Sequence, residues 1–350
     1  MNQILLRTNK GEYRPGEEIY GVVYLSIVNP TAGRGVKLKF KGNEFFIYHL
    51  PDDPVNSSDQ MFIKDQKDYI DCNNVSLFTA DSSLMLGDYA FPFQLKLLSE
   101  IPGSFKFGQI GSKDNAKWDG YVKYWLEAEV IDARTVKTEQ PLLVYHDLPK
   151  GYDPGALPAV CIKHQFTHWM FFTQTIFITA RLMDHTWTSG RSAKLRLIVT
   201  NDTKLNVTSV IIRLIRTILL KSKKSGPIGV VVWEREINDC NQNVLNKGLD
   251  NILIPLLDKN GAAVPPTVSG HYIECKYSIE VVTRLSNGSA SPLTVPIPRI
   301  LPDRNQEWHT WKPPEWVYNT TVKSAQGLFQ VPQNVLSSEV FSGIPGFQAL

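Results

Sequence analysis

The stretch Gly35-Val36-Lys37-Leu38-Lys39-Phe40-Lys41-Gly42 decides the fold. Its apolar residues alternate strictly with lysines, and this two-residue period is typical of a half-buried β-strand. Residues 122–130 show the same alternation. The chain also has 22 prolines and 23 glycines, which interrupt the apolar runs before a long helical period is established. The sequence therefore predicts an all-β protein of the sandwich or barrel type with little helix.

The two halves of the chain repeat the same motifs in the same order. Such internal repetition constrains the architecture more strongly than local propensity does. The matched pairs are Tyr13-Arg14-Pro15-Gly16 with Trp187-Thr188-Ser189-Gly190, Ile101-Pro102-Gly103-Ser104 with Val264-Pro265-Pro266-Thr267, and Lys123-Tyr124 with Lys276-Tyr277. We therefore predict two tandem antiparallel β-sandwiches of immunoglobulin-like design.

A segment rich in proline and glycine separates the two halves. Residues 147–158 contain three prolines and two glycines, which disfavour both a helix and a central strand. We expect a first domain at residues 1–147, a hinge at 148–158, a second domain at 159–305 and a C-terminal tail at 306–350. The basic charge is concentrated in the second half: residues 1–150 hold 17 Lys and Arg against 20 Asp and Glu, whereas the remainder holds 20 against 14.

Composition and terminal sequence indicate a folded cytoplasmic protein. An apolar content of 43% with 20% charged residues is ordinary for a globular chain and too hydrophobic for a disordered one. The first residues lack the pattern of a secretory signal, and no apolar run approaches the roughly 18 residues of a membrane span. The four cysteines are too widely spaced for a disulfide framework or a zinc site, so we expect reduced thiols.

Motifs of known catalytic chemistry are incomplete in this sequence. Residues 103–108 have the glycine spacing of a phosphate-binding loop, but Gln109 and Ile110 follow where Lys and Ser or Thr are needed. His164 and His168 have the spacing of a zinc protease without its glutamate, in surroundings that favour a strand. There is no Gly-x-Ser-x-Gly elbow. We therefore expect a non-enzyme with no cofactor, no metal and no nucleic-acid partner.

Four motifs of the first half carry a family resemblance. They are Tyr13-x-x-Gly16-Glu17, Gly35-Val36-x-Leu38-x-Phe40-x-Gly42, Leu86-Gly87-Asp88-Tyr89-x-Phe91-Pro92-Phe93 and Ile101-Pro102-x-Ser104-Phe105. Through them the chain resembles the arrestin superfamily, most closely its alpha-arrestin (arrestin domain-containing) branch. The resemblance covers roughly residues 3–300 and is looser in the second half, where Arg191 stands in place of the usual glutamate.

The resemblance implies the arrestin fold and a non-catalytic adaptor or scaffold. Such a protein would link the cytoplasmic tails of membrane cargo to endocytic, trafficking or ubiquitination machinery, including clathrin adaptors and ubiquitin ligases, and would lie peripherally at the plasma membrane or endosomes. The alternative within this fold is a coat subunit for endosomal sorting, similar to the arrestin-fold subunit of retromer. A carbohydrate-binding or hydrolytic β-sandwich is a further alternative, but it would need a signal sequence or paired carboxylates.

Two groups of basic residues are candidate binding sites. Arg7, Lys10 and Arg14 lie on or beside the first predicted strand, where arrestins carry basic residues that contact phosphorylated cargo tails. A second cluster has the density needed to hold the phosphates of an inositol lipid, and it is similar in place to the phosphoinositide site of beta-arrestins. Its members are Arg213, Arg216, Lys221, Lys223 and Lys224. The alternative in both cases is an ordinary solvated charge.

The C-terminal tail departs from the alpha-arrestin pattern. Alpha-arrestins usually recruit ubiquitin ligases through Pro-Pro-x-Tyr motifs, but after Pro313 and Pro314 this chain has Trp316 at the tyrosine position. We expect weak or no binding to WW domains, with Trp308, Trp311 and Trp316 packed against the second domain. For residues 327–331 three alternatives stay open: docking on the first domain, a short motif resembling a weak clathrin box, or disorder.

Overall fold

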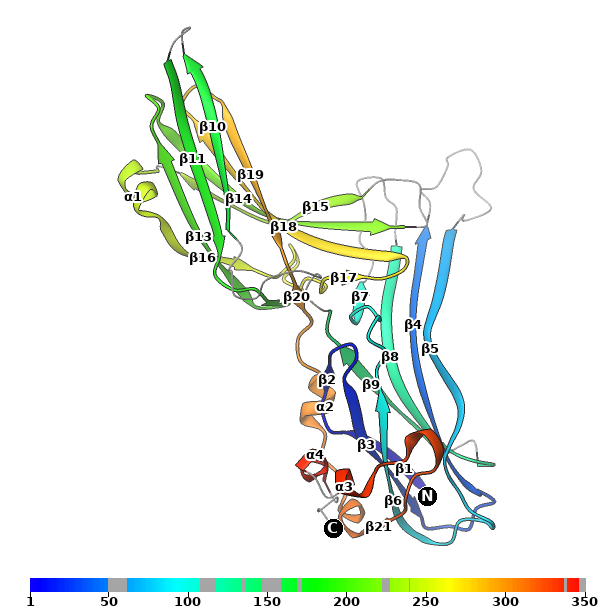
Figure 1. Cartoon of the computed structure of the whole chain (residues 1–350). Helices are drawn as coiled ribbons and strands as arrows, with labels where there is room; N and C mark the ends of the chain where they lie inside the picture. Colours follow the sequence, from blue (N-terminus) through cyan, green and yellow to red (C-terminus); the bar gives the residue numbers. More distant parts are fainter. Residues whose placement is uncertain are drawn as a thin grey trace. The chain divides into compact units, whose positions relative to one another are not determined.

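Strands dominate both parts of the computed structural model (Figure 1). The structure describes residues 1–49, 62–107, 118–133, 136–146, 159–168, 172–221, 227–238, 240–336 and 339–345. They divide into two units: residues 1–145 together with 304–350, and residues 146–303. The predicted all-β fold of antiparallel sheets is confirmed. The predicted hinge at 148–158 lies outside the described residues.

Two sheets form the first unit. The first has the order β1 (Gln3–Thr8), β3 (Glu18–Ile27), β6 (Gly87–Lys96), β21 (Thr321–Val322). The second has the order β2 (Glu12–Tyr13), β9 (Lys137–Val144), β8 (Trp118–Val130), β4 (Gly35–His49), β5 (Phe62–Thr79), with β7 (Phe105–Phe107) on β8. The sheets pack face to face, since the rings of Phe78 on β5 and Phe91 on β6 have centroids 5.1 Å apart.

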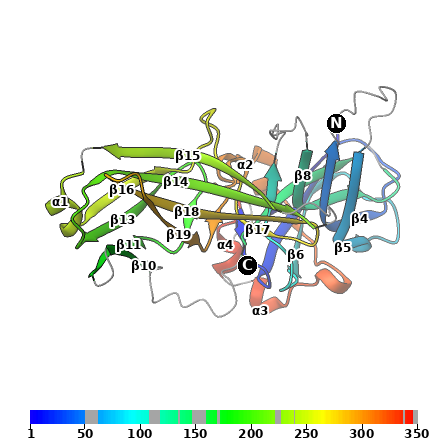
Figure 2. The ribbon, with the colours of Figure 1, turned by 90° about the horizontal axis from the view of Figure 1, so that it is seen from above.

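The second unit repeats this two-layer design (Figure 2). One sheet has the order β10 (Ala159–His168), β11 (Phe172–Leu182), β13 (Ser192–Asn201), β16 (Leu249–Pro255). The other has the order β15 (Ile228–Asn238), β14 (Val207–Leu220), β18 (Ile273–Leu285), β17 (Val268–Ser269), with β19 (Ala290–Ile297) on β18. The short pair β12 (Trp187–Thr188) and β20 (Ile300–Leu301) and the helix α1 (Gln242–Lys247) complete the unit.

The sequence repeat is reproduced at the entry to each unit. Tyr13 on β2 and Trp187 on β12 are both buried, and each strand makes a short parallel pair, β2 with β9 and β12 with β20. Gly16 and Gly190 follow with φ of 81° and 77°. A side chain is strained in that left-handed region, which explains why both motifs end in glycine.

The repeat extends to individual hydrogen bonds. The hydroxyl of Tyr124 donates to the carbonyl of Pro102 at 2.8 Å, and the hydroxyl of Tyr277 donates to the carbonyl of Pro265 at 2.6 Å. Each bond anchors a loop rich in proline to the middle of a long strand. The matched motifs of the sequence are therefore equivalent in structure.

β3 is buried on both faces. Val23 and Leu25 are fully buried, and so are Val22 and Tyr24, although these two pairs point to opposite sides because side chains alternate along a strand. The second side is covered by residues 304–345, which we call the C-terminal segment. A strand covered on both faces is continuously apolar, as residues 19–27 almost are.

The C-terminal segment lies across the outer face of β1, β3 and β6. It contains α2 (Gln306–Thr310), η1 (Glu315–Asn319), β21, η2 (Gly327–Phe329), α3 (Gln333–Leu336) and α4 (Glu339–Ser342). Val317, Leu336 and Phe341 pack there against Val22 and Tyr24. Of the alternatives for the tail, docking on the first domain is the one observed.

The lysines of β4 face glutamates of β8. Lys39 Nζ lies 2.7 Å from Glu127 Oε1 and 2.8 Å from Glu129 Oε2, and Lys41 Nζ lies 3.5 Å from Glu127 Oε2. The Lys39 side chain is only 17% exposed. This face of the strand is therefore a partly shielded network of ion pairs.

This network predicts a loss of stability in acid. Burial raises the pKa of Glu127, but Lys39 and Lys41 outweigh it and lower the pKa below the usual 4.5. A carboxyl with a lowered folded-state pKa stabilises the fold above its unfolded pKa and loses that effect as pH falls through the folded value. We expect Glu127→Gln to lower the free energy of unfolding by about 1 to 3 kcal/mol at pH 7.

The loss should shrink as the pH falls below about 4.5, the unfolded value, and through the lower folded-state pKa, below which the wild-type carboxyl is also neutral. Denaturant unfolding of both proteins at pH 7 and pH 3 measures the difference. Asp81→Asn, at an exposed position, is the control and should match the wild type at both values. An equal loss of unfolding free energy at pH 7 and pH 3 for Glu127→Gln would contradict a lowered pKa of Glu127.

Candidate functional site

Arg7 is a buried cation on the outer face of β1. It lies opposite Val22 of β3 and is 9% exposed. Its guanidinium carbon lies 3.7 Å from the ring centroid of Trp308 and 4.9 Å from that of Trp311, and Nη1 donates to the carbonyl of Trp308 at 2.6 Å. Among the described residues, no carboxylate forms an ion pair with it. Burial lowers the pKa of the Arg7 guanidinium.

The short helix α2 brings Trp308 to this position. Asn305 caps the helix by accepting a hydrogen bond from the Trp308 amide at 3.2 Å, and Pro313 and Pro314 follow its end, where they cannot continue a helix. Glu12 Oε1 accepts from the Asn305 amide at 2.8 Å and lies 3.0 Å from His309 Nε2. These bonds fix the helix on the first unit.

Trp308 contacts Thr8 of β1 and Gly11 just beyond that strand. Its indole Nε1 donates to the carbonyl of Thr8 at 3.1 Å. A Cβ at Gly11 would lie 3.1 Å from the indole Cδ2, so glycine is what permits this close approach. Trp316 binds further along the same strand, where its Nε1 donates to Gln3 Oε1 at 3.1 Å. The prediction that the three tryptophans pack against the second domain is wrong, because their partners belong to the first unit.

A pocket lies beside Arg7, between β1, β9 and α2. Among the described strands, β1 pairs on one side only, with β3, and the other side faces this pocket. Residues 138–141 of β9 form the opposite wall. Three kinds of group meet here: a strand edge, the Arg7 cation and the indoles. The lining residues are Leu5, Leu6, Arg7, Thr138, Glu139, Gln140, Pro141, Asn305, Glu307, Trp308 and Trp311.

Lys10 and Arg14 lie near Arg7 in sequence but do not share its environment. Both are exposed. Lys10 Nζ is 3.7 Å from Glu17 Oε2, and the backbone amide of Arg14 donates to the same oxygen at 3.1 Å. The three residues therefore do not form one open basic face: Arg7 is covered, whereas the other two surround a carboxylate at the following turn.

The described part of the predicted phosphoinositide cluster is dispersed. Arg213 Nε contacts Glu234 and its Nη1 lies 3.0 Å from Glu280 Oε2, whereas Arg216 is 5% exposed. Residues three apart on a strand point to opposite faces, which separates these two arginines. Lys221 Nζ donates to the carbonyl of Gly270 at 2.7 Å. Lys223 and Lys224 lie outside the described residues, so lipid binding by the cluster stays a prediction.

The described residues form neither a metal-binding cluster nor a membrane-spanning helix. No group of three His, Cys, Asp or Glu side chains is placed to hold a metal ion. No helix there has the length and apolar character needed to span a membrane. His164 and His168 lie on β10, a strand as the sequence predicts.

A family model described as "Arrestin (or S-antigen), N-terminal domain" matches residues 3–145. The match covers the β-sandwich of the first unit and ends before the C-terminal segment. It supports the arrestin superfamily, whose members are generally non-catalytic adaptors, and it does not distinguish the alpha-arrestin branch. No curated protein matches the chain.

Proposed function

We propose that this protein is an adaptor that captures the phosphorylated cytoplasmic tail of a membrane protein along β1 and presents it to trafficking or ubiquitination machinery. The observation that carries the proposal is the Arg7 guanidinium, a buried charge with indoles and a carbonyl as its partners but no carboxylate among the described residues. A buried cation is stabilised most by an anion. A phosphate group beside β1 would supply one.

The open side of β1 supports an extended ligand. A peptide that adds to a strand edge gains main-chain hydrogen bonds, while side-chain pockets give specificity. Here the edge, the pocket and the cation adjoin one another. Lys10 and Arg14, exposed just beyond the strand, would contribute longer-range attraction for a tail that carries several phosphates. Such a protein would work in the cytoplasm at the plasma membrane or on endosomes.

Replacing Arg7 tests this proposal. We expect Arg7→Ala to weaken binding of a fluorescent tail peptide with several phosphoserines by about 10- to 100-fold, since a hydrogen bond to a charged group is worth about 1.5 to 3 kcal/mol. Binding of the unphosphorylated peptide should not change. Fluorescence anisotropy with the full chain at two salt concentrations measures both, and the remaining binding should be less sensitive to salt.

Arg34→Ala is the matched control, because Arg34 is an exposed arginine of the same unit outside the pocket. It should leave both affinities unchanged. Equal binding of phosphorylated and bare peptides by the wild type would contradict the proposal, and so would equal losses in the two variants.

A further inference from the structure

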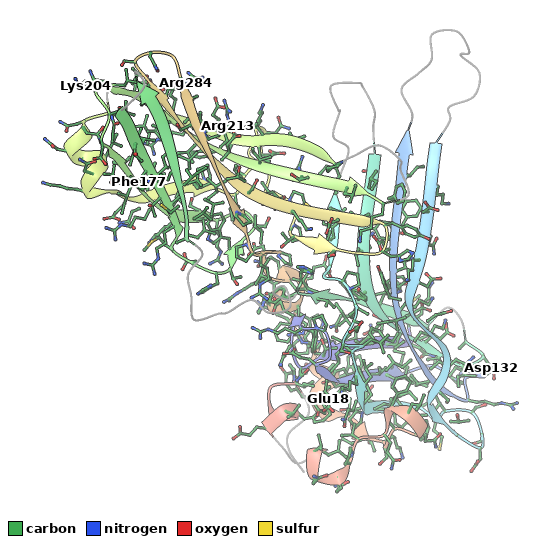
Figure 3. All side chains as sticks on the ribbon, turned by 45° about the horizontal axis from the view of Figure 1, so that its top comes forward. Glu18, Asp132, Phe177, Lys204, Arg213 and Arg284 are labelled. Carbon is green, nitrogen blue, oxygen red and sulfur yellow. The ribbon has the colours of Figure 1, made fainter. Side chains whose placement is uncertain are left out.

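Basic residues are concentrated on one sheet of the second unit. The strands β10, β11, β13 and β16 contain a single carboxylate, Asp250, against four basic side chains that belong to Lys163, Arg181, Lys194 and Arg196. On the other sheet, acidic and basic residues are nearly balanced. Arg213 and Arg284, which Figure 3 labels, are both in ion pairs there. Residues 151–350 have a basic excess of 20 − 14 = 6, and this one sheet contributes 4 − 1 = 3 of it, which is half.

These four basic residues point away from the core. Their neighbours in sequence, such as Leu182 and Leu195, are fully buried, and side chains alternate between the two faces of a strand. Lys163, Arg181 and Lys194 are exposed. Arg196 is partly exposed and pairs with Asp250 at 2.9 Å. No described carboxylate pairs with the other three.

The arrangement is electrostatically unfavourable for the isolated unit. Arg181 and Arg196 are direct partners in the register of β11 and β13, and like charges directly opposite one another destabilise a sheet. Only one of the two has a carboxylate partner among the described residues. An external anionic surface would offset this repulsion.

Apolar side chains are interleaved with the charges. Leu253 is 50% exposed and lies opposite Lys194 in the register of β16 and β13. Phe177 and Ile198 are also partly exposed on this face. The register places the charged residues over roughly 20 Å along three neighbouring strands, so the charge is spread in two dimensions and not along a single line.

We propose that the outer face of the β10–β11–β13–β16 sheet docks on an anionic lipid bilayer. A bilayer presents negative charge in two dimensions and accepts apolar side chains between its headgroups. An acidic peptide, in contrast, contacts a groove or one strand edge. This docking face is separate from β1 and does not depend on the proposed recognition of cargo.

Charge removal on this face tests the inference. The full chain should bind vesicles of phosphatidylcholine with phosphatidylserine and should not bind phosphatidylcholine alone. Arg181→Gln with Lys194→Gln should weaken binding about 30-fold, which corresponds to about 2 kcal/mol for two basic residues near the surface. Vesicle sedimentation at increasing salt measures this, because the attraction falls off over the Debye length.

Lys276→Gln with Arg284→Gln is the matched control. It removes the same charge from exposed positions of β18 on the opposite sheet, and it should keep wild-type binding. Lys163→Gln alone, expected to lose about five-fold, provides a second variant if the first double variant has a lowered melting temperature.

Three results would overturn the inference: no vesicle binding by the wild type, equal losses in the two double variants, or capture of a polyglutamate peptide without capture of vesicles. The vesicles carry no cargo peptide. Failure of this experiment therefore leaves the peptide-binding proposal unaffected, and failure of peptide binding leaves the bilayer proposal unaffected.

Discussion

Replacing Phe341 with alanine should lower the free energy of unfolding of the first unit by about 3 to 5 kcal/mol. Phe341 is fully buried, and its ring meets Tyr20 of β3 edge-on, with centroids 5.9 Å apart. The variant would leave a cavity over the outer face of β3, lined by Tyr24 and Leu336. Denaturant unfolding measures the loss, and hydrogen exchange of the β3 amides locates it in the first unit.

Leu328→Ala is the control for this prediction. Leu328 belongs to the same C-terminal segment but is 78% exposed, so its truncation should change the free energy of unfolding by no more than about 0.5 kcal/mol. Small and equal effects of the two substitutions would show that the segment does not pack on β3 in solution. A large effect of Phe341→Ala without faster exchange in β3 would place the contact elsewhere.

The contribution of the C-terminal segment changes what counts as the first domain. The family model ends at residue 145, but Val22, Tyr24 and Ala90 would expose an apolar face without residues 304–345. The hydroxyl of Tyr24 donates to the carbonyl of Pro345, so the cover extends to the last described residues. The family model therefore matches only residues 3–145, whereas the compact unit also includes residues 304–350.

The fold could be predicted from sequence because its signals are local or repeated. Alternation in residues 35–42 and 122–130 identifies strands, since the period of a strand is a property of the backbone. The matched motifs around Tyr124 and Tyr277 identify two similar units, and both tyrosines make the same hydrogen bond. These features need no information on distant contacts.

The site could be predicted only in part. Arg7 is correctly singled out as a residue of β1, but its partner Trp308 is 301 residues away, and no local pattern specifies such a contact. Trp308, Trp311 and Trp316 are expected to be buried, and their closeness in sequence to the second domain favoured packing on that domain. Their observed contacts are with the first unit. One feature of the sequence does predict that another segment covers the first sheet: the apolar run of residues 19–27 is nearly continuous, which indicates a strand covered on both faces.

The basic cluster at 213–224 shows a different limit. Basic residues that are close in sequence do not form one basic surface when they alternate between the two faces of a strand. Arg213 pairs with two carboxylates, whereas Arg216 is buried. The basic sheet of the second unit has the opposite character. Lys163, Arg181 and Lys194 are spread along the sequence and come together only through strand pairing.

Replacing Trp308 with alanine should increase the affinity for a phosphorylated peptide while it lowers stability. The indole covers the Arg7 guanidinium and donates to Thr8. It therefore stabilises a closed state, in which Trp308 covers the proposed phosphate site. A cation–π contact and one hydrogen bond are together worth about 1.5 to 3 kcal/mol. Their loss should raise the apparent affinity about 10- to 100-fold, because a larger fraction of molecules is open.

Trp316→Ala separates this effect from general loosening of the segment. Trp316 donates to Gln3 and packs against the apolar cluster around Tyr24 and Phe341. It is not among the residues that contact Arg7 or line its pocket. It should lower stability without a gain in affinity. Adding Arg7→Ala to Trp308→Ala should abolish the gain in affinity, since the open site then lacks the guanidinium that binds the phosphate. Equal gains in the two tryptophan variants would mean that the segment restricts binding without acting through Arg7, and weaker binding by Trp308→Ala would mean that the indole is itself part of the peptide site.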